Sequence, residues 1–120
     1  MRNQDIYLKD IVEAMNKIVD FVEGITLEEF QKDDKTSSAV IRKFEIIGEA
    51  TKNITDDIRK KYSKIPWKEM AGMRDRLIHS YSGIDYKLVW ATIKNSIPEV
   101  KELLKKILEE SKNNSQSEII

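Results

Sequence analysis

Apolar residues recur every three or four positions along three long stretches of the chain, and this spacing constrains the fold more than any other feature. The stretches are Leu8 to Val22 (Leu8, Ile11, Val12, Met15, Ile18, Val19, Val22), Val40 to Gly48 (Val40, Ile41, Phe44, Ile47, Gly48) and Leu88 to Ile107 (Leu88, Val89, Ile93, Ile97, Val100, Leu104, Ile107). Such a stripe is typical of an amphipathic helix. The sequence therefore predicts three long helices that bury one face each.

Residues near the ends of these stretches indicate where helices begin. Thr26 and Glu29 form a capping-box pattern, and the polar run QKDDKTSS at residues 31–38 predicts a loop in which Thr36 or a serine caps the next helix. Thr55, followed by two acidic residues, favours another helix start.

Two prolines and one aspartate mark the second half of the chain. Pro66 suits the first turn of a helix that we expect to run toward Gly83, Asp85 suits a cap of the last long helix, and Pro98 predicts a kink inside it. We find no convincing strand pair, repeat or linker. The economical fold is one all-α domain, an antiparallel bundle of four or five helices over residues 1–110, followed by a polar tail at residues 111–120 that we expect to be flexible.

Composition excludes several kinds of site. The chain has no cysteine, so disulfides and thiolate metal sites are impossible. Glu45 and Glu49 share a helix face, but no histidine stands at metal-ligand spacing beside them, so we expect no metal and no cofactor. No stretch approaches the roughly 20 apolar residues of a membrane span, and we expect a soluble, cytoplasmic protein.

Charge is balanced over the chain but not along it. Residues 59–76 hold seven basic and two acidic side chains. A run of this kind is commonly a solvated helix face, and an anion or phosphate site competes with that interpretation because the run leads into the only histidine. The basic side chains that could contact such an anion are Lys60, Lys61, Lys64, Lys68 and Arg76.

The stretch GMRDRLIHSYSG, residues 72–83, contains that histidine. On a continuous helix Asp75 and His79 would share a face, so the carboxylate would orient the imidazole, whereas Arg74 and Tyr81 would lie elsewhere around the axis. A histidine can act as general acid or base, an arginine can grip a phosphate and a tyrosine hydroxyl can donate a proton. The set suits phosphodiester chemistry without a metal.

A structural interpretation stands beside this one. His79 could cap a helix C-terminus, Arg74 and Arg76 could pair with acidic groups on a neighbouring helix, and Tyr81 could be a half-buried packing residue. Trp67 and Trp90 are expected to be core or interface anchors.

The sequence RDRLIHSY, Arg74 to Tyr81, resembles the R-x-x-x-x-H-x-Y signature of the HepT-like branch of the HEPN superfamily. IRKFEIIGEA, residues 41–50, resembles that branch's second-helix signature, and residues 65–90 are similar to its motif region in order and spacing. The likeness extends from Asp5 to about Leu108.

This resemblance implies a helical bundle that pairs as a homodimer around a shared cleft. It implies a metal-independent endoribonuclease toxin in which Arg74 and His79 are catalytic, Asp75 is the polar residue beside the arginine, and Tyr81 is both an active-site group and the residue that a minimal nucleotidyltransferase antitoxin adenylylates. Gly48 would permit close approach of a helix, at the dimer interface or in the core. As a ribonuclease the chain would contact the RNA backbone through Lys60, Lys61, Lys64, Lys68 and Arg76. The alternative is a non-catalytic nucleotide- or protein-binding helical dimer that partners a nucleotidyltransferase.

Overall fold

The computed structural model describes residues 2–79 and 83–119; for residues 2, 3, 79 and 114–119 it describes the backbone alone. The elements in chain order are α1 (Arg2–Phe21), α2 (Leu27–Lys32), α3 (Asp34–Lys52), α4 (Asp56–Lys61), α5 (Trp67–Ala71), α6 (Met73–Leu77), β1 (Ile78–His79), β2 (Gly83–Ile84), α7 (Tyr86–Ala91), the π-helical turn η1 (Thr92–Ser96) and α8 (Ile97–Ile119).

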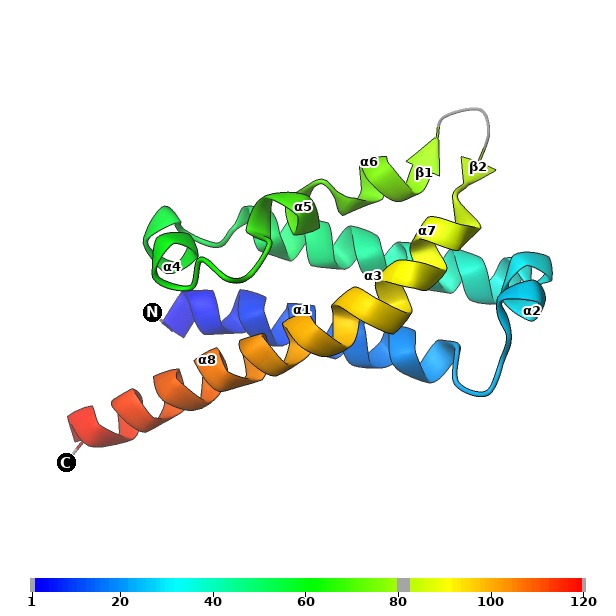
Figure 1. The fold of residues 1–120 in the computed structure, drawn as a ribbon. Coiled ribbons are helices and arrows are strands. Elements are labelled where there is room, and N and C mark those ends of the chain that lie inside the picture. Colours follow the sequence, from blue (N-terminus) through cyan, green and yellow to red (C-terminus); the bar gives the residue numbers. More distant parts are fainter. Residues whose placement is uncertain (1, 80–82, 120) are drawn as a thin grey trace.

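Three long helical segments form the body of the molecule. Helices α1 and α3 lie antiparallel, and α7, η1 and α8 follow one another as a third segment across them (Figure 1). The short helices α4, α5 and α6 connect α3 to this third segment, and α5 and α6 contact α3. The predicted helical fold is confirmed, while the predicted homodimer stays a prediction.

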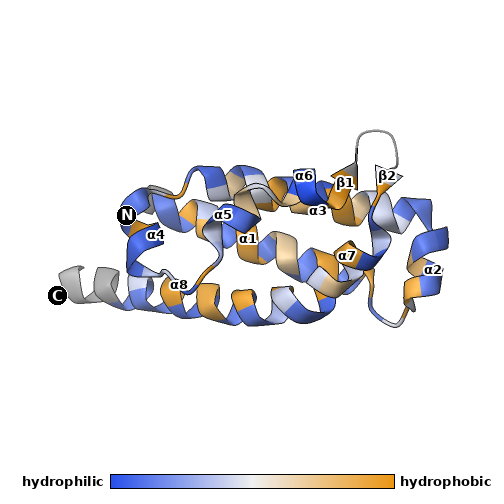
Figure 2. Cartoon of the chain, turned by 45° about the horizontal axis from the view of Figure 1, so that its top comes forward, coloured by the Kyte–Doolittle hydropathy of each residue, from blue (hydrophilic) through white to orange (hydrophobic). Residues whose placement is uncertain are grey.

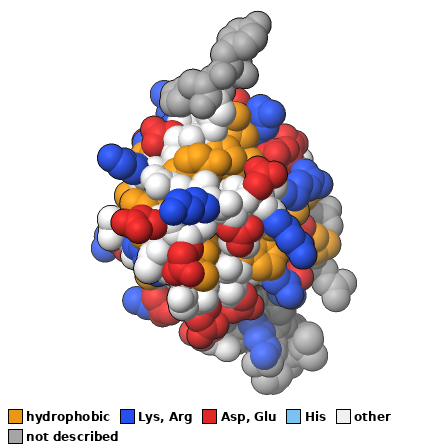
Figure 3. All heavy atoms as spheres, turned by 90° about the vertical axis from the view of Figure 1, so that its right-hand side faces the viewer, with side chains coloured by type: hydrophobic (Ala, Val, Ile, Leu, Met, Phe, Trp, Pro, Cys, Tyr) orange, Lys and Arg blue, Asp and Glu red, His pale blue; other side chains and the backbone are white. Residues whose placement is uncertain are grey.

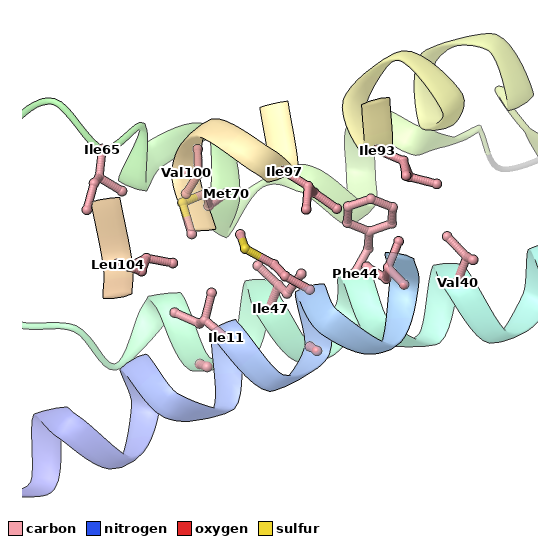
Figure 4. Packing of buried hydrophobic residues seen from close by; sticks show 14 of the residues in the cluster. Ile11, Val40, Phe44, Ile47, Ile65, Met70, Ile93, Ile97, Val100 and Leu104 are labelled. Atoms are coloured by element: carbon pink, nitrogen blue, oxygen red, sulfur yellow. The ribbon is translucent and has the colours of Figure 1, made fainter. Parts of the chain in front are cut away.

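The core lies where the three predicted apolar stripes meet. Val40, Phe44 and Ile47 of α3 have at most a trace of exposed surface, and Ile97 and Leu104 of α8 pack toward them (Figure 4). Hydrophobic residues accordingly alternate with hydrophilic ones along the long helices (Figure 2). Burial of apolar area at about 25 cal/mol per Å² is the main force that holds such helices together.

Of the two tryptophans, one lies in the core and the other packs against it, in agreement with the predicted role as core anchors. Trp67 is buried and its indole Nε1 donates a hydrogen bond to the Tyr62 carbonyl at 3.1 Å. Trp90 is partly buried, and its ring centroid lies 5.4 Å from that of Phe30.

Helix starts agree with the sequence at some positions and differ at one. The capping box of Thr26 and Glu29 is confirmed by reciprocal hydrogen bonds of 3.1 and 3.0 Å, and Asp85 accepts from the Leu88 amide at 3.1 Å. The predicted loop at residues 31–38 is wrong: α2 ends at Lys32, Asp33 caps α3, and α3 begins at Asp34. The Asp33 carboxylate accepts from both the amide and the hydroxyl of Thr36, so Thr36 is the donor and not the cap.

The last helical segment contains an irregularity near Pro98. The five residues of η1 form a π-helical turn directly before α8 starts at Ile97, so the proline stands in the first turn of α8. A proline cannot donate a helical hydrogen bond from its own nitrogen, and the π-turn accommodates this loss.

The predicted domain boundary at residue 110 falls inside α8, and the Ser111 hydroxyl donates to Asp5 at 2.7 Å. Flexibility of residues 111–120 stays a prediction.

The predicted helix from Pro66 toward Gly83 is wrong. It is divided into α5 and α6 at Gly72, and α6 ends at Leu77. Ile78 then adopts extended angles, φ −122° and ψ 123°, and β1 pairs antiparallel with β2, Ile78 opposite Ile84 and His79 opposite Gly83. The Asp85 amide also donates to the Leu77 carbonyl at 2.9 Å. These hydrogen bonds between the two sides of the hairpin, with the left-handed Gly83 (φ 81°), replace the next helical turn.

Candidate active site

Helices α3 and α6 meet where the RDRLIH sequence begins. Gly48 of α3 makes the approach possible, because a β-carbon there would lie 3.3 Å from the carbonyl oxygen of Ala71 at the end of α5. Of the two predicted roles for Gly48, packing within one chain is what the structure shows. The glycine sets the separation between α3 and the short helices that carry the motif.

Arg74 of α6 reaches back to α3. Its Nε atom lies 3.8 Å from Oε2 of Glu45, and its Nη1 atom lies 3.8 Å from Oδ1 of the adjacent Asp75. Glu45 Oε2 is also 3.8 Å from Nη1 of Arg42. These separations exceed hydrogen-bond length and are those of ion pairs at a solvated surface. For Arg74, the pairing with an acidic residue of a neighbouring helix, which the structural interpretation proposed, is confirmed.

A polar hollow of about 330 Å³ accompanies this cluster. Its walls come from α3, α5 and α6, and its lining residues are Glu45, Gly48, Glu49, Lys52, Ala71, Arg74 and Asp75. Lys52 pairs with Glu49 at 3.7 Å. The hollow is large enough for a phosphate group and several water molecules.

The prediction that Asp75 and His79 share one face of a continuous helix is wrong. His79 belongs to β1, beyond the last helical residue Leu77, so the four-residue helical spacing does not apply to it. Asp75 instead pairs with Arg74. The histidine's backbone is fixed at the first strand of the hairpin, close in sequence to the buried Leu77, which anchors the end of α6. Tyr81 lies outside the described residues.

The predicted RNA-contacting residues are separated in space. Arg76 lines a different, largely apolar groove of about 310 Å³ between α5–α6 and α7–α8, so it lies apart from the hollow beside Arg74. Lys60 and Lys61 belong to α4 and Lys64 follows it, at the end of the molecule opposite the β1–β2 hairpin in two views (Figures 1 and 2). Lys68, in α5, is closer in sequence to Arg74, and all four lysines are exposed.

On the face at the α2 end, the molecular surface has no patch in which all charged side chains have the same sign. Lys and Arg side chains alternate there with Asp and Glu (Figure 3). Among the described residues, no group of three or more acidic or histidine side chains could hold a metal ion. Within the same residues, the helices are too short or too polar to cross a membrane.

Comparison with known proteins identifies the family. Residues 11–107 match the family described as "Ribonuclease HepT-like". The chain belongs to this family. It is therefore a HepT-like ribonuclease, as the resemblance implied.

Three relatives are similar in sequence to this chain along nearly their whole length. The "Probable ribonuclease HepT" of Thermococcus cleftensis is 48% identical over 88% of this chain and 96% of its own. A "putative RNase" of Caldanaerobacter subterraneus subsp. tengcongensis is 45% identical over 93% of this chain and 100% of its own, and one of Methanocaldococcus jannaschii is 47% identical over 89% and 92%. No solved structure matches the HepT-like chain significantly.

The sequence pattern does not identify the charged residues of α3, Glu45, Glu49 and Lys52, as part of the site. Glu45 was considered only as a metal ligand, whereas the structure makes it the interhelical partner of Arg74. Its three-residue spacing from Arg42 was visible in the sequence. The contact with Arg74 was not, because it depends on how α6 lies against α3.

Proposed function

We propose that this HepT-like ribonuclease is a metal-independent endoribonuclease toxin whose site is built on Arg74 and His79. The observation that most supports this proposal is that Arg74, paired with Glu45, lies beside the polar hollow. The next element of the chain, β1, carries His79. An arginine offers a phosphate a planar set of donors, and a histidine titrates near neutral pH.

The proposed reaction uses the substrate's own 2′-hydroxyl. That oxygen forms a bond to phosphorus while the bond from phosphorus to the 5′-oxygen breaks, which leaves a 2′,3′-cyclic phosphate and a free 5′-hydroxyl. His79 takes the 2′ proton, the departing oxygen receives a proton from water or from the second subunit's histidine, and Arg74 stabilises the charge on the phosphate. DNA, which lacks the 2′-hydroxyl, is spared.

The proposal includes an assembly and an inhibitor. Two chains pair so that two copies of the motif face a shared cleft. A minimal nucleotidyltransferase silences the toxin: the Tyr81 hydroxyl attacks the α-phosphorus of ATP, pyrophosphate leaves, and the adenylate adds negative charge and bulk where RNA must bind. Co-expression with such an antitoxin should add adenylate mass to the parent chain and none to Tyr81→Phe.

The test is cleavage of labelled single-stranded RNA in EDTA by protein shown by intact mass to be unmodified. The parent is compared with His79→Ala, Arg74→Ala and a control, Lys105→Ala, which removes an exposed cation from α8. We expect cleavage by the parent and the control only. Cleavage by all four proteins would reveal a contaminant, and cleavage by none, on messenger or transfer RNA, would favour the non-catalytic binding dimer.

A further inference from the structure

Among the described carboxylates of the hollow, Glu45 is the one that lies near arginines of two different helices. Its Oε2 atom lies 3.8 Å from Arg74 on α6 and 3.8 Å from Arg42 one turn earlier on α3. Glu49, one turn later on the same helix and lining the same hollow, pairs with Lys52. Glu45 is thus the described carboxylate that joins the two helices through an arginine.

The two carboxylates beside Arg74 differ in how firmly they are held. Glu45 exposes 33% of its side chain and has two arginine partners, whereas Asp75 exposes 87%. Asp75 can therefore swing into solvent at little cost, because exposed ion pairs contribute little free energy. Glu45, with less exposed surface and a second arginine partner, is the more firmly held of the two carboxylates.

The atoms in contact show which part of Arg74 remains for a substrate. Glu45 lies at Nε, on the side of the guanidinium group, and Asp75 lies at Nη1, at its end. A guanidinium can bind two anions, one along each edge. A phosphate that replaces Asp75 at the end of the group would leave the Glu45 contact intact.

The backbone beneath Glu45 is also closely packed. Gly48, three residues later on α3, is where the helix meets the Ala71 carbonyl, and this contact sets the distance from which Glu45 reaches α6. A carboxylate on such a fixed frame can keep an arginine in one orientation. Misplacing a catalytic group by about 1 Å can lower a rate about a hundredfold.

We propose that Glu45 is a positioning residue, which holds Nε of Arg74 so that the Nη end faces the scissile phosphate. This inference rests on the proposed ribonuclease mechanism. Asp75 occupies the phosphate's place at Nη1 until RNA binds. Glu45 itself does not touch the substrate.

The test compares Glu45→Gln with Glu49→Gln in the full chain. Both changes remove one negative charge from the same helix and hollow, but only the first removes a partner of Arg74. Less repulsion of RNA should lower KM in both variants or leave it unchanged. We expect kcat to fall about 10- to 100-fold in Glu45→Gln and to fall much less in Glu49→Gln, which lines the hollow without pairing with Arg74.

A double-mutant cycle separates positioning from a general loss of structure. If Glu45 acts through Arg74, adding Glu45→Gln to Arg74→Lys should cost much less activity than it costs the parent. Equal kcat values for Glu45→Gln and Glu49→Gln, or full additivity with Arg74→Lys, would overturn the proposal while the parent's own cleavage upheld the ribonuclease mechanism.

A readout without catalysis keeps the inference testable if the parent cleaves no RNA. The Nε–Hε resonance of Arg74, assigned from its disappearance in Arg74→Lys, should shift in Glu45→Gln and stay in place in Glu49→Gln. An unchanged resonance in Glu45→Gln would overturn the proposal whatever the outcome of the cleavage assay.

Discussion

Gly48 and Ala71 bring α3 and α5 into backbone contact, since a β-carbon at Gly48 would meet the Ala71 carbonyl oxygen at 3.3 Å. Glu45 lies one turn away on α3, and Arg74 lies three residues beyond Ala71. The relation between these two backbones therefore determines whether Glu45 and Arg74 can meet at all.

Replacing Gly48 by valine should push the two helices apart. We expect a loss of about 1–3 kcal/mol in the free energy of unfolding, the usual cost of overpacking, together with reduced RNA cleavage because Arg74 moves from Glu45. Urea denaturation and the cleavage assay measure both effects. Gly72→Ala is the control: its β-carbon would make an ordinary 3.6 Å contact and its φ of −96° suits any residue. Equal stability of the two variants would contradict the prediction.

The effect of each basic residue on RNA binding should depend on where that residue lies along the molecule. Lys68→Gln should weaken binding of a short, uncleavable 2′-O-methyl RNA and reduce the salt dependence by about 0.7 in the slope of log K against log salt, the value for one phosphate on a single strand. The triple change of Lys60, Lys61 and Lys64 to glutamine should matter only for a strand long enough to reach α4 (Figure 1). Fluorescence anisotropy with a short and a long strand checks this.

An equal loss of short-strand affinity in the two variants would disprove this division of the basic residues. It would show that α4 lies beside the site in the assembled protein.

Asp33 should stabilise the folded chain, and this stabilisation should be lost in acid. Hydrogen bonds from the Thr36 hydroxyl and amide hold the pKa of the Asp33 carboxyl below its ordinary value of 3.8. Because the folded chain favours the ionised form, this stabilisation is present above pH 3.8 and is lost as pH falls through the lower folded pKa. Thermal unfolding of Asp33→Asn should show a shallower loss of Tm below that pH than the parent.

Thr36→Val is the matched test of the cause of that shift. It removes the hydroxyl donor and keeps the amide, so it should give an intermediate acid dependence. A parent and an Asp33→Asn variant with parallel curves would contradict the assignment.

Tyr62 should behave in the opposite way at alkaline pH. Partial burial, and then the hydrogen bond of its hydroxyl to Glu110 at 2.9 Å, raise the pKa of Tyr62 above the ordinary 10.0. The folded chain favours the neutral phenol, so the stabilisation is present below pH 10.0 and is lost as pH rises through the folded pKa. A phenolate absorbance titration should lose a component that titrates above pH 10.0 in Tyr62→Phe.

Glu110→Gln separates the two causes of the raised Tyr62 pKa. Removing the carboxylate should lower that pKa toward 10.0 without reaching it, because the burial remains. A titration of Glu110→Gln that matches the parent would show that burial alone is responsible.

Local sequence patterns determined the long helices and several of their ends. The apolar period of α1, α3 and α8 placed residues such as Phe44 and Leu104 in the core, since a helix with one apolar face has to bury it. The Thr26 and Asp85 caps also follow from contacts three residues apart, which sequence spacing encodes directly. The RDRLIHSY stretch resembles the family, and the match of residues 11–107 shows the membership.

Tertiary contacts decided the local shape of the site. The motif continues a helical pattern, but β1 pairs with β2 and the Asp85 amide binds the Leu77 carbonyl, so His79 lies on a strand. Glu45 meets Arg74 because Gly48 lets α3 and α5 touch. The first outcome depends on hydrogen bonds across the hairpin and the second on contact between two helices, and a helical period encodes neither. The local preference for one more helical turn is small, so such contacts can override it.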